Sequence, residues 1–378
     1  GEAAAGFSAC LQGVLHCTRL KLATGSDFFQ TFSPTPKMTT LRVLLHVAAQ
    51  RDYELHSLDF STAFLQGSLH EEIWLRRPPG FTGTTLAALG FAPSTSDPSL
   101  FLRTDTTLQP FYVLVYVDDL VFATADTEAL AHVKSELQKR HTCTDLGELT
   151  SYLGLRITRD RAQRTITLTQ SHMVQQVLQR FGFTYSSPES TPLPTSHSLS
   201  APPSDESVEP SGPYPELVGY LMYLMTCTRP DLAYPLSLLA RYVAPGRHRK
   251  STHSSLVLSS SCDAEIYGGA MAAQELRWLT YLLTDLGEAP RSPPVLYVDN
   301  KAMLALCQEH RLEHRMKHIA LRYFLAREVQ QRGQLRLAYV ASQANTADVF
   351  TKALQPCDHQ HFCTVLGLVP SVPHLLTS

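Results

Sequence analysis

The sequence of 378 residues contains no long hydrophobic run, and charged residues are scarce in it. Its longest uninterrupted apolar stretch is Phe111–Val117, much shorter than the roughly 20 residues that a membrane-spanning helix needs. We therefore expect no membrane partner. Charged residues make up only 17% of the chain and the net charge is −2, which excludes overall basicity as a source of polyanion binding. Any contact with nucleic acid would have to come from local basic patches.

Cysteine pairs of the CxxC type are also absent, although the chain has eight cysteines. Scattered single cysteines exclude a disulfide scaffold and favour a reducing compartment. No basic segment followed by an apolar stretch opens the chain, so no targeting signal is visible. We expect a fragment of a longer product that is located inside the cell, in a cytoplasmic particle or the nucleus.

Prolines and serines are concentrated in one internal segment. Between Tyr185 and Pro215 the chain has eight prolines and little apolar periodicity. Such composition is typical of an extended linker between folded halves. We predict a first domain at 1–184, a linker at 185–216, a connecting segment at 217–250, an α/β domain at 251–358 and a tail at 359–378.

Hydrophobic periodicity predicts different element orders on the two sides of this linker. The first half reads as α+β, with hairpins and amphipathic helices, and the second half reads as α/β. Predicted strands cover 111–117, 120–123, 151–158, 164–169, 295–298 and 335–340, and predicted helices cover 126–140, 171–181, 261–286 and 318–331. A further helix is expected after Asn300.

Two adjacent acids, Asp118 and Asp119, separate two β-rich runs and so lie at a predicted hairpin turn. Neighbouring carboxylates in an apolar stretch repel one another and lose solvation, which a bound divalent cation would relieve. A third acid, Asp59, ends another strand-like segment. Three carboxylates from two strands can hold two Mg²⁺ ions for in-line phosphoryl transfer. The plainer alternative is an acidic turn without a ligand.

Several longer motifs follow one another along the chain. In the first half they are QTFSPTPKMTTLRVLLHVAAQRDYELHSLDFSTAFLQGSLHEEIWLRRPPGF, LGFAPSTSDPSLF, VLVYVDDLVFA, DLGELTSYLGLRI and LTQSHMVQQVLQRFGF. In the second half they are YPELVGYLMYLMTCTRPDLAYPLSLLARY, SSSCDAEIYGGAMAAQELRWLTYLLTDLG, PPVLYVDNKAMLAL, HRMKHIALRYFLARE and NTADVFTKAL. In this order the motifs resemble the reverse transcriptases of copia-type LTR retrotransposons. The resemblance implies a palm/fingers-type α+β polymerase domain followed by an α/β ribonuclease H-like domain.

The resemblance assigns roles to residues of the first half. It implies that Asp59, Asp118 and Asp119 are the catalytic, metal-binding acids, with two Mg²⁺ ions as cofactors. Phe64 would lie under the nucleotide sugar and Arg19 would meet the triphosphate. The implied partners are an RNA template, a DNA primer, an RNA–DNA hybrid and deoxynucleoside triphosphates.

In the second half, Glu265, Asp299 and Asp348 match three of the four metal-binding acids of the family's ribonuclease H domain, where Mg²⁺ would also bind. A basic stripe could face nucleic acid or simply be solvated. It comprises Arg311, Arg315, Lys317, His318 and Arg322. Near the C-terminus, Cys357, His359, His361 and Cys363 could bind zinc, but their strict alternation lacks the usual paired spacing and disfavours this.

Both domains depart from the family pattern and are predicted to be incomplete. A long stretch that the family carries is missing between Phe81 and Leu89, and the strands that open the nuclease are missing between Gly246 and Ser254. The fingers strand pair at 20–25 also looks short. Metal-dependent transfer needs accurately placed ligands, so we expect weak or absent activity. The alternatives are a catalytically dead remnant that at most binds nucleic acid, and a nuclease without polymerase function.

Overall fold

The computed structural model describes residues 36–60, 81–197, 213–243, 261–301, 304 and 320–369, without the side chains of 81–84, 261–266 and 320–325. The helices are α2 (Met38–Arg51), α3 (Phe81–Ala88), α4 (Thr127–Arg140), α5 (Ser171–Arg180), α6 (Tyr214–Cys227), α7 (Ala233–Leu239), α8 (Ser261–Asp285), α10 (Ala320–Gln331) and α11 (Pro356–Val365). The short 3₁₀ helices include η2 (Pro230–Leu232), η3 (Ala240–Tyr242), η5 (Ser342–Ala344) and η6 (Thr346–Phe350).

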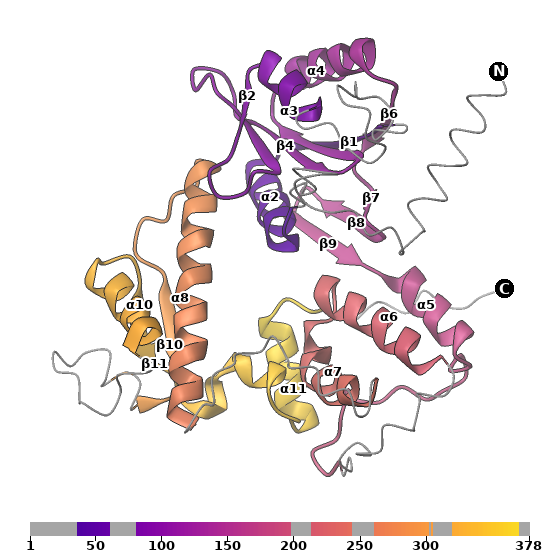
Figure 1. The fold of residues 1–378 in the computed structure, drawn as a ribbon. Coiled ribbons are helices and arrows are strands. Elements are labelled where there is room, and N and C mark those ends of the chain that lie inside the picture. The colour runs from indigo at the N-terminus through magenta and orange to yellow at the C-terminus, as the bar shows by residue number, and fades with distance from the viewer. Residues whose placement is uncertain are drawn as a thin grey trace, which may run out of the picture.

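A six-stranded antiparallel sheet forms the centre of the first half (Figure 1). Its order is β2-β3-β4-β5-β1-β6. The strands are β1 (Glu54–Phe60), β2 (Phe91–Pro93), β3 (Leu100–Arg103), β4 (Phe111–Tyr116), β5 (Asp119–Thr124) and β6 (Cys143–Glu148). Strand β1 therefore lies inside the sheet, between β5 and β6, and its ends are fixed by hydrogen bonds on both sides.

Side chains alternate between the two faces along each strand, and both faces of this sheet are buried. One face packs against α3 and α4 through residues such as Leu58, Phe122 and Leu137. The opposite face, which carries Val121 and Ala123, packs against α2 and the smaller β7–β9 sheet. The sheet is thus the middle layer of the first half and its strand ends are rigid.

The smaller sheet consists of β7 (Ser151–Tyr152), β8 (Leu155–Asp160) and β9 (Thr165–Thr169) in that order. The predicted strand at 151–158 was wrong as a continuous element. Leu153 and Gly154 both have a positive φ, +47° and +71°, and turn the chain back so that Tyr152 pairs with Leu155. Glycine adopts this conformation without steric cost, whereas leucine rarely does.

Helix α8 lies against the first half, although it belongs to the predicted second domain (Figure 1). Leu282 and Leu286 are buried in the same core as α2 and the main sheet. The indole Nε1 of Trp278 donates to the Ser96 backbone oxygen at 2.8 Å, and the Tyr112 hydroxyl donates to the Leu286 backbone oxygen at 2.7 Å. Consequently the two halves share a hydrophobic core.

The rest of the second half contains a two-stranded parallel sheet of β10 (Val295–Val298) and β11 (Arg336–Tyr339). Helix α10 packs on α8, and η6 packs against α7, η2 and α11. No helix within the described ranges is long and apolar enough to cross a membrane.

Most of the predicted elements are confirmed with small shifts at their ends. They include the hairpin with Asp118 at its turn, helix α4, helix α8 and strand β10. The helix expected after Asn300 lies mostly outside the described residues. The predicted domain boundaries stay predictions.

The attachment of α8 can be tested at Asp285. Its Oδ2 atom accepts from the Ser94 hydroxyl at 2.5 Å, the Ser96 hydroxyl at 2.8 Å and the Ser96 N–H at 3.2 Å. We expect Asp285→Ala to lower the free energy of unfolding by about 1–3 kcal/mol, because hydrogen bonds to a charged group are lost. Urea unfolding measures this. Gln274→Ala, at an exposed position of the same helix, should change little, and equal effects of both variants would contradict the attachment.

Candidate active site

Three acids predicted from the sequence come together at one end of the main sheet. Asp59 is the penultimate residue of β1 and Asp119 is the first residue of β5, and the two are direct partners in the antiparallel register. Residues directly opposite in such a pair share a face of the sheet, with Cβ atoms about 4.5–5.5 Å apart. Asp118 precedes Asp119 in the turn, and its backbone oxygen accepts from the Phe60 N–H at 2.8 Å. The prediction that folding brings Asp59 beside the tandem acids is confirmed.

The turn that carries Asp118 holds a strained residue. Tyr116 pairs with Asp119, so Val117 and Asp118 form a two-residue turn. Val117 has φ +56°, a left-handed conformation that a β-branched side chain rarely adopts. Buried strands on both sides hold the turn in this conformation. Such strain is found at sites where the surrounding structure fixes the position of a functional group.

The electrostatics of the site oppose ionisation of Asp119. Burial raises the pKa of the Asp119 carboxyl above its ordinary value, and the neighbouring charges of Asp59 and Asp118 raise it further. Oδ1 of Asp118 is also buried. Clustered carboxylates that lose solvation are stabilised by protons or by a cation.

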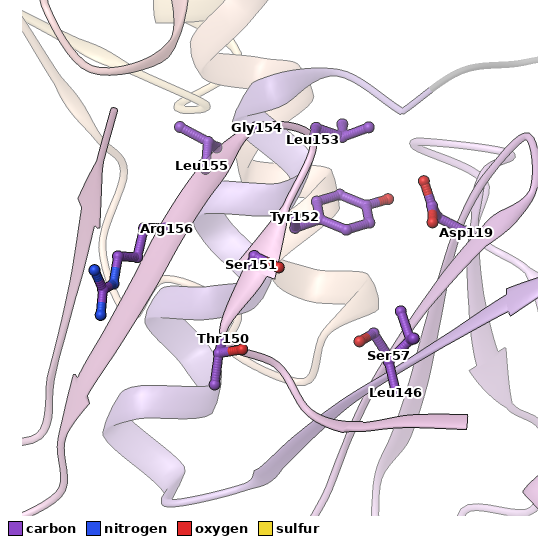
Figure 2. A pocket seen from close by; sticks show the side chains of 10 residues that line it. All are labelled: Ser57, Asp119, Leu146, Thr150, Ser151, Tyr152, Leu153, Gly154, Leu155 and Arg156. Carbon is purple, nitrogen blue, oxygen red and sulfur yellow. The ribbon is translucent and has the colours of Figure 1, made fainter. Parts of the chain in front are cut away.

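A cleft of about 560 Å³ opens beside Asp119 (Figure 2). Ser57 and Leu146 line it from the main sheet, and the β7–β8 hairpin lines it on the other side. In Figure 2 the phenol oxygen of Tyr152 is directed at the Asp119 carboxylate across this space. Asp119, one of the three acids, therefore lines a space that can admit a ligand.

The β7–β8 hairpin was not assigned a role from the sequence. Its stretch SYLGLRI belongs to one of the matching motifs, but an alternating apolar pattern does not reveal what a turn faces. The available signal was the pair Leu153–Gly154, because a glycine between two strand-like runs is typical of a turn.

Other predicted site residues lie outside the described part. These are Phe64, Arg19, Arg311, Arg315, Lys317 and His318. Arg322 lies in α10, but its side chain is not described. Their predicted roles stay predictions.

The three nuclease-like acids lie on different elements. Asp299 directly follows β10, and Glu265 lies in α8 with its side chain outside the description. Asp348 lies in η6, is 9% exposed, and accepts from the Lys352 ammonium at 2.9 Å. Among the described side chains, neither Asp299 nor Asp348 belongs to a group of three possible metal ligands. Their convergence stays a prediction.

The described residues do contain one group with the donor types of a metal site. Oxygen, nitrogen and sulfur atoms of Asp231, His359 and Cys363 lie within 4.8 Å of one another. However, both carboxylate oxygens of Asp231 accept from the Arg229 guanidinium, at 2.9 and 2.7 Å. The negative charge of Asp231 is thus already paired with the Arg229 guanidinium, in place of a metal ion. Cys357 and His361, also considered as zinc ligands, are exposed on the same helix and do not belong to the group.

The repulsion in the acid cluster predicts a stability change for Asp119→Asn. Because the Asp119 pKa is raised in the folded state, protonation of Asp119 favours folding. This contribution to stability is complete at low pH and is lost as the pH rises through the raised pKa. We expect the variant to unfold at higher urea concentration than the parent at pH 7.5 in EDTA, by up to about 1 kcal/mol.

The pH dependence provides the control for this prediction. Between about pH 4 and 7.5 the parent should lose stability relative to Asp119→Asn, as expected for an acid with a raised pKa. Asp358→Asn removes an exposed acid and should not produce this difference. Lower stability of Asp119→Asn at pH 7.5 would contradict the repulsion.

The sequence of the chain matches a known protein family. The sequence pattern described as "Reverse transcriptase (RNA-dependent DNA polymerase)" matches residues 18–85 and 82–195. The match is thus broken at 82–85, within the interval where a stretch is predicted to be missing. Asp59 lies in the first piece, and Asp118, Asp119 and Tyr152 lie in the second.

Two plant proteins match most of the chain. The "Retrovirus-related Pol polyprotein from transposon RE2" of Arabidopsis thaliana is 30% identical and covers 92% of the chain. The similarly named protein from transposon TNT 1-94 of Nicotiana tabacum is 28% identical and covers 87%. The chain spans about a third of the length of these relatives, 30% and 32%.

A shorter relative and the alignment length complete the comparison. A putative transposon Ty5-1 protein of Saccharomyces cerevisiae is 29% identical, over 50% of the chain and 70% of that protein. The alignment with the Arabidopsis RE2 protein covers 441 positions, more than the whole chain has, so part of the relative has no counterpart here. Through residues 18–195, the chain belongs to the reverse transcriptase family of the Pol polyproteins that copia-type retrotransposons encode.

Proposed function

We propose that this chain is the polymerase region of a retrotransposon polyprotein and that its chemistry is RNA-directed DNA synthesis. The substrates would be deoxynucleoside triphosphates, with a DNA primer and an RNA template as partners. The observation that carries the proposal is the register of β1 against β5, which places Asp59 opposite Asp119 and beside Asp118. Adjacent carboxylates at the edge of an open cleft suit phosphoryl transfer assisted by metal ions.

The donor set fits a hard divalent cation. Asp59, Asp118 and Asp119 offer only oxygen ligands, and burial together with like charge raises the Asp119 pKa. Mg²⁺ prefers carboxylate oxygens, so we propose two Mg²⁺ ions held by these three residues. When bound, such ions neutralise charge on phosphate oxygens and lower the pKa of an attacking hydroxyl.

The chain's own residues would orient the substrates. The rigid strand ends of β1 and β5 fix the acids, and the β7–β8 hairpin forms the opposite wall of the cleft. Phe64 would contact the nucleotide sugar and Arg19 the triphosphate, as the family resemblance implies. The basic stripe from Arg311 to Arg322 would contact the phosphate backbone of an RNA–DNA hybrid.

Weak activity is part of this proposal. The break of the family match at 82–85 supports the loss of a segment between the two parts of the polymerase. Helix α3 starts at Phe81 and leads directly into β2, so the main sheet forms without that segment. We infer that the acids are placed correctly while the contacts to nucleotide and template are reduced.

Primer extension tests the assigned chemistry. With Mg²⁺, an RNA template and a DNA primer, we expect slow extension by the intact chain. Asp118→Asn should reduce it to the level without protein, because one metal ligand is lost. Asp105→Asn, at an exposed turn, serves as the matched control and should leave the rate unchanged. Equal extension by the parent and Asp118→Asn would remove the mechanism, and no extension by either would favour the dead remnant.

We further propose that the second half is a remnant of a ribonuclease H-like domain. The parallel pairing of β10 with β11 and the position of Asp299 at the carboxyl end of β10 support this. Glu265 and Asp348 would be its other acids. The fourth acid and the opening strands of the family's nuclease have no counterpart in the sequence.

This incompleteness predicts little nuclease activity. We expect an RNA–DNA hybrid incubated with the chain and Mg²⁺ to be cleaved no faster than the background, and Asp299→Asn to make no difference. Gel analysis of a labelled hybrid measures this. Cleavage that depends on both Mg²⁺ and Asp299 would show that the remaining acids suffice.

A further inference from the structure

Tyr152 has a buried hydroxyl beside the acid cluster. Its side chain is 5% exposed and belongs to the core between α2 and the sheets. Within the described part of the chain, the hydroxyl oxygen is buried and has no hydrogen-bond partner. A phenylalanine would fill the same volume without this unsatisfied group, so packing alone does not account for the hydroxyl.

The surroundings of the hydroxyl make it a donor directed at an acceptor. Burial, together with the nearby charge of Asp119, raises the Tyr152 pKa, so the phenol keeps its proton. An ionised carboxylate can only accept hydrogen bonds. Figure 2 shows the phenol oxygen pointing from β7 toward Asp119, and both residues line the cleft.

The backbone of Tyr152 is held in place from two directions. Tyr152 pairs with Leu155 across the turn, and the Tyr223 hydroxyl of α6 donates to the Leu153 backbone oxygen. Helix α6 is itself fixed, because the Arg42 guanidinium donates to the backbone oxygens of Thr226 and Cys227 at 2.8 and 2.7 Å. The phenol is therefore presented to the cleft by a rigid support.

We propose that Tyr152 is a positioning residue of the polymerase site, whose hydroxyl donates a hydrogen bond to ionised Asp119 and fixes the orientation of that carboxylate. The inference rests on the proposed function, because it concerns the acids that would bind the metal ions. No bond to substrate is required of Tyr152, and its effect is transmitted through Asp119.

The position of Asp119 in the register explains why it needs a separate support. Both β1 and β5 are paired on two sides, but Asp119 is the first residue of β5 and directly follows the turn. Like charge on Asp59 and Asp118 pushes its carboxylate away from the cluster. A donor from the opposite wall stabilises the ionised Asp119 carboxylate in one orientation, without adding a positive charge that would compete with a metal ion.

The test uses Tyr152→Phe in the full chain, with Mn²⁺ as the probe. Electron paramagnetic resonance measures the concentration of free Mn²⁺ and therefore the fraction that is bound. We expect the variant to fold with an unfolding midpoint at least equal to that of the parent. Its dissociation constant for Mn²⁺ should rise about 3- to 30-fold, and the Mn²⁺ concentration for half-maximal primer extension should rise in parallel.

Tyr112→Phe is the matched control. Tyr112 lies in the same core, but its hydroxyl donates to the backbone oxygen of Leu286 and not to an acid of the cluster. This variant should lower the unfolding midpoint and leave Mn²⁺ affinity unchanged. A change in affinity confined to Tyr152→Phe separates positioning from general loosening of the core.

Two outcomes distinguish failure of this inference from failure of the proposed function. If Asp119→Asn weakens Mn²⁺ binding but Tyr152→Phe binds as the parent does, Tyr152 has no positioning role and the metal site stands. If the parent and Asp119→Asn bind Mn²⁺ equally, the acids are not a metal site, and both proposals are wrong.

Discussion

The antiparallel register of β1 against β5 is the constraint on which the site depends. A shift by one residue would turn Asp59 to the opposite face of the sheet, since side chains alternate along a strand. The register is enforced by burial of both faces, with Leu58 and Phe60 on one side and Val121 and Ala123 on the other. The repulsion among the acids is thus overcome by packing that extends along the whole sheet.

The same packing explains why the three acids stay together although the chain lacks a segment of its relatives. The main sheet forms without the long segment predicted to be missing between Phe81 and Leu89, and α8 covers part of its core. The hydrogen bonds of Asp285 and Trp278 to the loop at 94–96 attach that helix to the first half. The family match and the long alignment indicate that a segment of the relatives is missing here. The three acids themselves are present.

Local patterns in the sequence predicted much of this arrangement. The β-rich runs around Asp118 and Asp119 predicted the hairpin, and the apolar face of Leu130, Val133 and Leu137 predicted α4, because both signals are local in the sequence. The approach of Asp59 followed from the family resemblance. The docking of α8 on the main sheet could not be predicted, because it joins residues about 190 positions apart whose individual patterns fit any amphipathic helix.

The role of the β7–β8 hairpin escaped prediction for a similar reason. Tyr152 reads as an ordinary core residue, and only the fold shows that its hydroxyl is directed at Asp119. The turn at Leu153 requires a positive φ in a residue that rarely adopts one, and it is supported by a hydrogen bond from Tyr223 of α6, 70 residues further along the chain. Such supports are tertiary and leave no periodic signal.

Anomalous scattering from crystals of the chain soaked in Mn²⁺ tests the central claim most directly. The account predicts a peak at the end of the main sheet, within coordination distance, about 2.0–2.3 Å, of carboxylate oxygens of Asp59, Asp118 and Asp119. Carboxylates that lie on opposite faces of the sheet, or metal bound elsewhere with no peak between them, would contradict it.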